Sequence, residues 1–180
     1  MSDQMKSIDA RTMLAGTSKL EILMFTLGKD NRTGRDEIFG INVFKVLEVM
    51  SVPAITSAAK KAYPAEGTAN FHGMPVPVID LAKFIGIETD RKPETMVVTE
   101  YHGQPHGLLV KAVDNILIVD RAEMSVPPPK ILAEMGGMVT AVIETGDNRR
   151  VLMLDVETIV AETRQLDDHA LGVKNMPPGN

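Results

Sequence analysis

Residues 67–81 have the sequence GTANFHGMPVPVIDL, and this stretch decides which kind of fold the chain can form. Two extended runs, 67–72 and 74–81, meet at a single glycine, as in a β-hairpin. Pro75 and Pro77 stand two residues apart, so both remove a backbone donor from the same side of the second strand. We therefore predict that this strand lies at a sheet margin or at a barrel corner.

Further strand-like runs lie on both sides of this hairpin, with turn residues between them. They cover residues 20–27, 37–43, 96–101, 107–113, 116–119, 138–144 and 150–154. Residues 44–50 fit either helical spacing or a short turn that leads into another strand. A short helix is predicted over residues 6–15, and a closing helix runs from its N-cap, Asp155, to about residue 165. Strands at this spacing are typical of a sandwich or barrel rather than of a βαβ fold.

The chain also contains an internal echo. Gly40-Ile41, Val43, Val46 and Val49 recur as Gly107-Leu108, Val110, Val113 and Ile116, each at an offset of 67 residues. A match over five positions that opens on a glycine predicts two similar β subdomains.

Composition excludes several classes of partner and site. The net charge is −5 and is spread along the chain, with no Lys/Arg run, so nucleic acid is not an expected partner. The absence of cysteine excludes disulfides and thiolate chemistry, and it suits a reducing cytoplasm. No apolar run approaches the length of roughly 18 residues that a membrane helix needs, so we expect no direct membrane insertion.

Neither the histidines nor the carboxylates form a catalytic pattern. His102 and His106 are four residues apart, but Gly103 and Pro105 lie between them, so the segment is a hairpin and not a helix. Both are therefore predicted to be solvated turn histidines. Asp80 is predicted to cap a turn that begins at Leu81. No phosphate-binding glycine spacing is present. We therefore predict no enzyme, no metal and no cofactor.

Three segments together resemble the CheW-like coupling domain of bacterial chemotaxis. They are residues 20–49, which contain LEILMFTLG and EIFGINVFKVLEV, residues 67–81, and residues 140–160, TAVIETGDNRRVLMLDVETIV. The leader ARTMLAGTSKLEIL, the phrase FGINVFKV and the connector PPPK are most similar to the N-terminal domain of a CheV-type protein, in which a phosphorylatable receiver follows. The implied organisation is a leader over residues 1–19, a CheW-like domain over 20–165 and a linker or tail over 166–180.

The resemblance implies a mostly β fold of two five-stranded β-barrel-like subdomains packed side by side, which agrees with the echo. It also implies a non-enzymatic scaffold that couples transmembrane chemoreceptors to the histidine kinase CheA. The expected partners are the receptor's cytoplasmic tip and the regulatory domain of CheA, with weak self-association, and the expected place is cytoplasmic, peripheral to receptor arrays. A small-molecule-binding β-barrel sensor remains the alternative.

For the implied receptor groove we predict apolar residues at the subdomain junction and polar residues at the rim. They are Val43, Val46, Val49, Val110 and Val113, with Glu48, Asn70 and His72. His72 stands where the family has an arginine that is expected to pair with the residue at position 48. We predict that the Glu48–His72 pair survives as one hydrogen bond. It is expected to be weaker and pH-sensitive, because an imidazole, unlike a guanidinium, loses its charge near neutral pH.

Overall fold

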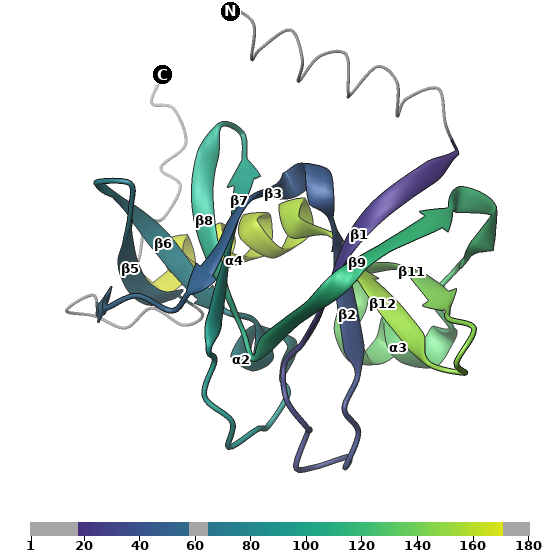
Figure 1. The fold of residues 1–180 in the computed structure, drawn as a ribbon. Helices are drawn as coiled ribbons and strands as arrows, with labels where there is room; N and C mark the ends of the chain where they lie inside the picture. Colours follow the sequence, from purple (N-terminus) through teal and green to yellow (C-terminus); the bar gives the residue numbers. More distant parts are fainter. Residues whose placement is uncertain (1–17, 58–64, 171–180) are drawn as a thin grey trace, which may run out of the picture.

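Two six-stranded sheets make up most of the computed structural model, which describes residues 18–57 and 65–170 (Figure 1). The helix predicted over residues 6–15 lies outside the described residues. The first sheet contains β1 (Lys19–Thr26), β2 (Ile38–Asn42), β9 (Ala112–Asp120), β10 (Met124–Ser125), β11 (Val139–Glu144) and β12 (Arg150–Leu154), in the order β10-β11-β12-β2-β1-β9.

The second sheet repeats this plan. It contains β3 (Val46–Ser51), β4 (Ile55–Thr56), β5 (Ala65–Phe71), β6 (Met74–Asp80), β7 (Thr95–Tyr101) and β8 (Gln104–Val110), in the order β3-β7-β8-β6-β5-β4. The mostly β fold of two paired sheets is confirmed, and each sheet has a sixth strand of two residues, β10 or β4, beyond the five that were predicted.

The two halves of the chain share strands between the sheets: the first sheet joins β1 and β2 to β9–β12, and the second sheet consists of β3–β8. After β2 a single 3-10 turn, η1 (Val43–Lys45), leads into β3, which leaves the first sheet and pairs with β7 in the second. After β8 the chain passes Lys111 into β9, which pairs with β1 in the first sheet. The single strand predicted over residues 107–113 was therefore wrong, because the chain changes sheet at Lys111. Of the two alternatives for residues 44–50, the turn followed by a strand is the observed one.

The internal echo marks equivalent positions in the two sheets. Val46 pairs with Thr99 and Val49 with Val97 in the second sheet, while Val113 pairs with Phe25 and Ile116 with Leu23 in the first. In both ladders a bulge separates these two pairs. The prediction of two similar β subdomains is confirmed by this shared register.

The glycines that open the echo are sites of close packing. A Cβ on Gly40 would lie 2.5 Å from the Cγ2 atom of Ile22, and a Cβ on Gly107 would lie 2.7 Å from the Sδ atom of Met96. Both glycines sit on a strand that pairs in parallel with its neighbour, β2 with β12 and β8 with β6. Only a residue without a side chain fits at either position without displacing a neighbour.

Apolar side chains form three clusters, one within each curved sheet and one between the sheets. The first-sheet core contains Ile22, Met24, Val119, Ala141, Ile143, Val151 and Met153. The second-sheet core contains Ala69, Phe71, Val76, Val78, Met96, Val98 and Leu109. The central core joins both sheets to the helices, and its fully buried members include Phe25, Phe39, Ile41, Ile79, Val97, Leu108 and Ile159.

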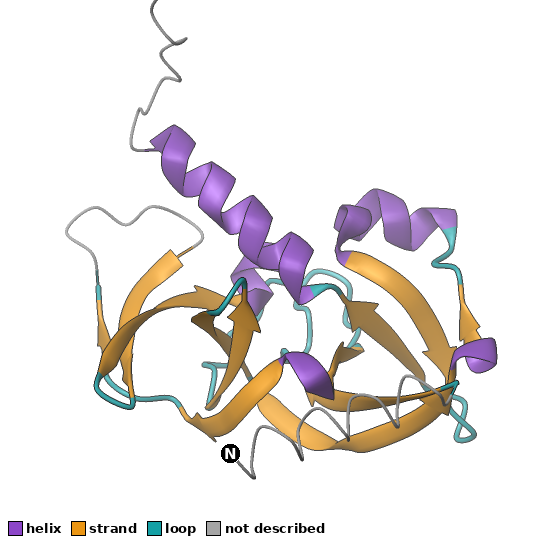
Figure 2. Cartoon of the chain, turned by 90° about the horizontal axis from the view of Figure 1, so that it is seen from above, coloured by secondary structure: helices purple, strands orange, loops and turns teal. Residues whose placement is uncertain are grey.

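Helix α4 (Val156–Ala170) lies along the back of the junction, on the side away from β3 and β9 (Figures 1 and 2). It begins as predicted at Asp155, whose carboxylate accepts hydrogen bonds from the Glu157 backbone at 3.1 Å and from the Thr158 hydroxyl at 2.8 Å. Val156, Ile159 and Val160 enter the central core. The helix therefore ties the two sheets together from behind.

Two short helices were not predicted. Helix α2 (Leu81–Ile85) follows Asp80, whose side chain caps it by accepting from the Lys83 backbone at 3.2 Å, in line with the capping role predicted for this residue. Helix α3 (Pro129–Met135) starts within the proline run, where a first-turn proline is compatible with a helix. No described helix is long and apolar enough to cross a membrane.

The strand that contains Pro75 and Pro77 lies within its sheet rather than at the margin. β6 pairs with β5 over Met74–Ile79, but with β8 only over Val78–Asp80. Of the two predicted places, a sheet margin or a barrel corner, the margin was therefore wrong for the strand order. It was right in one respect, because the proline-bearing half of β6 has no partner on the β8 side.

Candidate functional site

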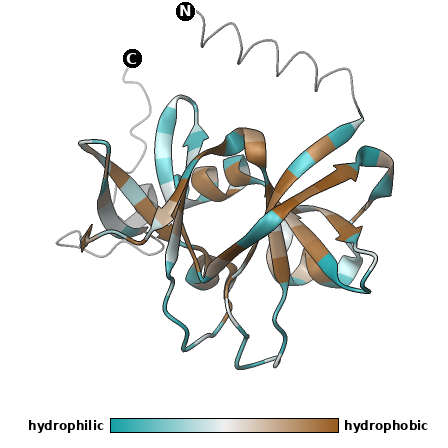
Figure 3. Cartoon of the chain, in the orientation of Figure 1, coloured by the Kyte–Doolittle hydropathy of each residue, from teal (hydrophilic) through white to brown (hydrophobic). Residues whose placement is uncertain are grey.

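The edge strands β3 and β9 lie at the front of the subdomain junction (Figure 1), and Figure 3 colours much of both ribbons as hydrophobic. We call this surface the junction face and define it by Val43, Val46, Val49, Val113, Ile116 and Ile118. Val49 is 42% exposed on β3, and Ile116 and Ile118 are 51% and 61% exposed on β9. Val43, Val46 and Val113 are half-buried and pack against the central core. The face is thus continuous with the core between the sheets.

Strand register explains why β3 presents these residues. Paired residues in an antiparallel ladder point to the same face of the sheet. Val49 pairs with Val97, a fully buried member of the central core, so Val49 points to the junction as well. The bulge at Leu47 keeps Val46 on this same face, opposite Thr99. Val46 and Val49, two residues of the predicted groove, therefore lie on the junction side of β3.

Strand β9 supplies the other rim of the junction face in the same way. Ile116 pairs with Leu23 and Val113 with Phe25, and both partners belong to the central core. Ile118, two residues after Ile116, lies on the same face of the strand. Ile116 and Ile118 were missing from the predicted site. The echo would have found Ile116, because it matches that residue with Val49.

Val110 is not part of the surface. It is 1% exposed and belongs to the central core near the end of β8. It pairs with Thr95 at one end of β7, whereas Val46 pairs with Thr99 near the other end. The prediction that Val110 lines an accessible groove is therefore corrected, because its side chain is enclosed by the protein itself.

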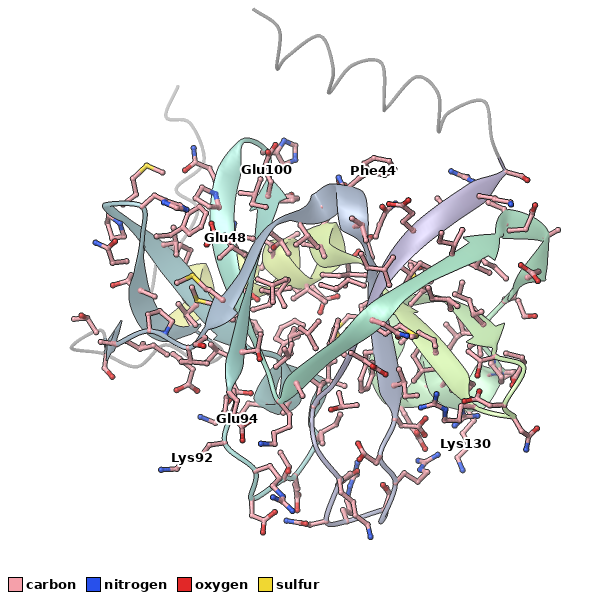
Figure 4. The ribbon with its side chains drawn as sticks, viewed as in Figure 1. Phe44, Glu48, Lys92, Glu94, Glu100 and Lys130 are labelled. Atoms are coloured by element: carbon pink, nitrogen blue, oxygen red, sulfur yellow. The ribbon has the colours of Figure 1, made fainter. Side chains whose placement is uncertain are left out.

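The predicted bond between Glu48 and His72 is present. The Nε2 atom of His72 lies 2.7 Å from Oε2 of Glu48, which joins β3 to the tip of the β5–β6 hairpin. Glu48 appears on the upper part of β3 in Figure 4. His72 has a left-handed backbone, φ 49°, and its ring meets that of Phe71 edge-on at 4.4 Å. The Asn70 side chain accepts from the Gly73 backbone at 3.0 Å and so shapes this turn.

A second polar group lies at the back of the junction, and here the sequence was misleading. His106, predicted to be a solvated turn histidine, is 3% exposed. Its Nε2 atom lies 3.4 Å from Nη2 of Arg164 on α4. Burial lowers the pKa of His106, the carbonyl of Gln104 opposes this shift, and the guanidinium of Arg164 adds to it. His102 is exposed at the hairpin tip, as predicted.

The described residues offer no assembled catalytic or metal site. Within residues 18–57 and 65–170, no group of three or more His, Cys, Asp or Glu side chains is placed to hold a metal ion. Asp80 and Asp155 are used as helix caps. What the arrangement offers a partner is an apolar face, whereas Glu48 pairs with Val98 of the second-sheet core and so points to the opposite face of β3.

Comparisons with known proteins agree with this geometry. A family model described as the CheW-like domain matches residues 21–164. The chain is 26% identical over 158 residues to the chemotaxis protein CheV3 of Helicobacter pylori, covering 84% of this chain and 50% of that protein. It is 28% identical over 146 residues to a probable chemotaxis protein CheW of Rhizobium etli, covering 79% and 88%. The chain thus spans half the length of the CheV3 relative but most of the CheW relative.

The fold has a counterpart among solved structures. The crystal structure of the scaffolding protein TtCheW from Thermoanaerobacter tengcongensis superimposes with a TM-score of 0.68 and 27% sequence identity. The match covers 78% of this chain and 91% of that chain.

Proposed function

The chain belongs to the CheW-like domain family, and from that premise we propose that it is a non-enzymatic adaptor that couples transmembrane chemoreceptors to the histidine kinase CheA. A scaffold role in chemotaxis is the character of the family, as the names of its relatives state. The proposal adds the two partners, the receptor's cytoplasmic tip and the regulatory domain of the kinase. It also adds a place beside the membrane, in receptor arrays.

The observation that carries the proposal is the junction face. Large exposed apolar residues that gather on one surface mark an interaction site more often than scattered ones do. Here they come from two edge strands at equivalent positions, with Val49 on one rim and Ile116 on the other. Val49, Ile116 and Ile118 are about half-exposed, so covering them completely contributes roughly half of the 1.5–3 kcal/mol that full burial of each would give, or about 2–4 kcal/mol together. Micromolar binding, about 8 kcal/mol, therefore needs further contacts around these three residues.

The alternative, a small-molecule sensor, finds less support in the described residues. A sensor of this architecture would hold its ligand inside a barrel, in a cavity with convergent polar groups. The interior of each curved sheet is instead filled by apolar side chains, those of the first-sheet core and the second-sheet core. A protein partner on the outside is the better fit.

Co-purification with a receptor-tip fragment and a CheA regulatory-domain fragment tests the proposal. Substitution of Val49 or Ile116 by Asp places a charge on the junction face without entering the core. We expect each variant to bind the receptor tip at least about tenfold more weakly, since a buried unpaired carboxylate costs more than the 1.4 kcal/mol that corresponds to tenfold.

Val126→Asp is the matched control, because Val126 is 84% exposed on the connector between β10 and α3. This control is expected to bind normally and to melt at the wild-type temperature. If both junction-face variants bind the receptor tip normally, the site assignment is refuted. If the wild-type chain binds neither fragment, the adaptor proposal itself is refuted.

A further inference from the structure

His106 is a buried histidine whose ring faces a positive charge. The Nδ1 atom lies 3.1 Å from the backbone oxygen of Gln104, and the Nε2 atom lies 3.4 Å from Nη2 of Arg164. A guanidinium can only donate, so Nε2 accepts the Arg164 hydrogen bond and Nδ1 carries the proton that is donated to Gln104. Both contacts are satisfied at once only by the neutral ring.

Tyr101 completes the group around Arg164. The guanidinium lies over the Tyr101 ring, with the Cζ atom 5.3 Å from the ring centroid. The rings of Tyr101 and His106 meet edge-on with centroids 6.3 Å apart. Arg164 is therefore held by an aromatic face and by an imidazole nitrogen, each from a strand of the second sheet, β7 or β8. We call Tyr101, His106 and Arg164 the helix clasp.

The helix clasp acts where the apolar packing of α4 ends. Ile159 and Val160 are fully buried and Thr163 is 5% exposed, but Leu166 is 45% exposed. The contacts of Arg164 thus attach the helix to β7 and β8 just beyond its buried part. At the other end of α4, Glu157 forms an ion pair with Lys45 of η1.

We propose that the helix clasp is proton-sensitive: it holds the second half of α4 against β7 and β8 while His106 is neutral, and it opens when His106 is protonated. A proton taken up from solvent binds to Nε2 and turns the acceptor of the Arg164 hydrogen bond into a donor. Two donors and two positive charges then face each other across 3.4 Å, on the buried ring of His106 and the exposed guanidinium of Arg164.

Among the side chains that the structure describes around His106, none gives the proton a compensating partner. Thr99 and Tyr101 face it from β7, Gln104 precedes it on β8, and Arg164 faces it from α4. Glu100 is the nearest acidic residue along β7, but it lies on the opposite face of that strand. Arg164 is therefore the charged group that opposes protonation, in agreement with the lowered pKa of His106.

Hydrogen exchange of the free chain tests the helix clasp without any partner. Amide exchange of residues 164–170, corrected for the intrinsic effect of pH, is expected to become at least about fivefold faster between pH 7.5 and pH 5.5. The decisive variant is Arg164→Glu, an exposed position where substitution leaves the core intact. In this variant protonated His106 gains a carboxylate partner, so the sign of the pH effect should reverse.

His102→Gln is the matched control, since His102 is an exposed histidine of the same hairpin. It is expected to keep the wild-type pH effect. A wild-type exchange rate that does not change with pH overturns the proposal, and so does an Arg164→Glu variant that keeps the wild-type sign. Because no receptor or kinase is present, either result would leave the adaptor proposal untouched.

Discussion

His72 and Glu48 are 24 positions apart in the chain, and their 2.7 Å hydrogen bond connects the edge strand β3 to the turn between β5 and β6. Both side chains are well exposed, so the bond adds little to stability. Its position on β3 gives it another use. Glu48 pairs with Val98 and points away from the junction face, but its bond to His72 tethers the edge strand that carries Val46 and Val49.

The first prediction concerns this pair. In His72→Asn the new residue tolerates the left-handed backbone, but its side chain is too short to reach the Glu48 carboxylate. The free energy of unfolding should change by less than about 1 kcal/mol, as for other exposed pairs, while receptor-tip affinity falls several-fold. Urea unfolding and a binding titration measure the two effects.

His102→Asn is the control for this prediction, because His102 has nearly the same backbone, φ 50°, at the other hairpin tip. Equal affinity losses in the two variants would contradict a specific role for the Glu48–His72 bond.

The second prediction compares two glycines. Gly40→Ala presses a methyl group against branched side chains, Ile22 at 2.5 Å and Val151 at 3.0 Å, and should destabilise the fold by about 1–3 kcal/mol. Gly107→Ala presses mainly on Met96, whose flexible thioether can move, so it should cost less. Gly146→Ala, which meets nothing within 4 Å, is the control. Equal urea midpoints for all three variants would refute this account of the echo.

The third prediction separates core from surface. Val110→Ala removes two methyl groups from a side chain that is 1% exposed and should cost about 2 kcal/mol of unfolding free energy. Receptor-tip affinity, measured well below the melting temperature, should stay the same. Val49→Ala should do the opposite, with normal stability and weaker binding. If Val110→Ala folds with wild-type stability but binds the receptor tip weakly, Val110 belongs to the binding site after all.

The fourth prediction concerns acid. The pKa of His106 is lowered in the folded chain, so the unfolded chain binds a proton first as the pH falls. The stabilisation from His106 is therefore complete above the unfolded pKa of about 6.5 and declines below it, toward the folded pKa. The free energy of unfolding should fall between pH 7.5 and pH 5.5, less steeply in a His106→Gln variant. Parallel pH dependence in the two proteins would argue against a contribution from His106.

Local sequence patterns were sufficient for most of the longer strands and for the likeness between the halves. An apolar run after the turn at residues 145–148 identified residues 150–154 as a strand, as observed for β12, and the offset between Gly40 and Gly107 matched two positions with the same packing. The two points at which the chain changes sheet, before β3 and before β9, were not predictable in this way. The turn at Lys111 has no glycine or proline, and the sheet that a strand joins is set by distant partners.

Burial by distant elements also explains the two site errors. Val110 and Val113 look alike in sequence, but one ends β8 inside the central core and the other starts the rim strand β9. His106 stands in a sequence typical of an exposed turn, Gly103 to Pro105, yet it is covered by Arg164, 58 positions later in the chain. Periodicity reports which residues share a face of a strand, not what lies over that face.

The way in which the two halves share strands has a consequence for how the protein unfolds. A cut between β6 and β7 would separate β1 and β2 from β9–β12, and β7 and β8 from β3–β6, so neither half should be a stable fragment by itself. The two sheets should then melt in a single cooperative step, and fragments cut in the loop over residues 88–94 should regain structure only when mixed. For a binding partner, the two rims are preorganised by backbone hydrogen bonds, so little conformational entropy is lost when it docks.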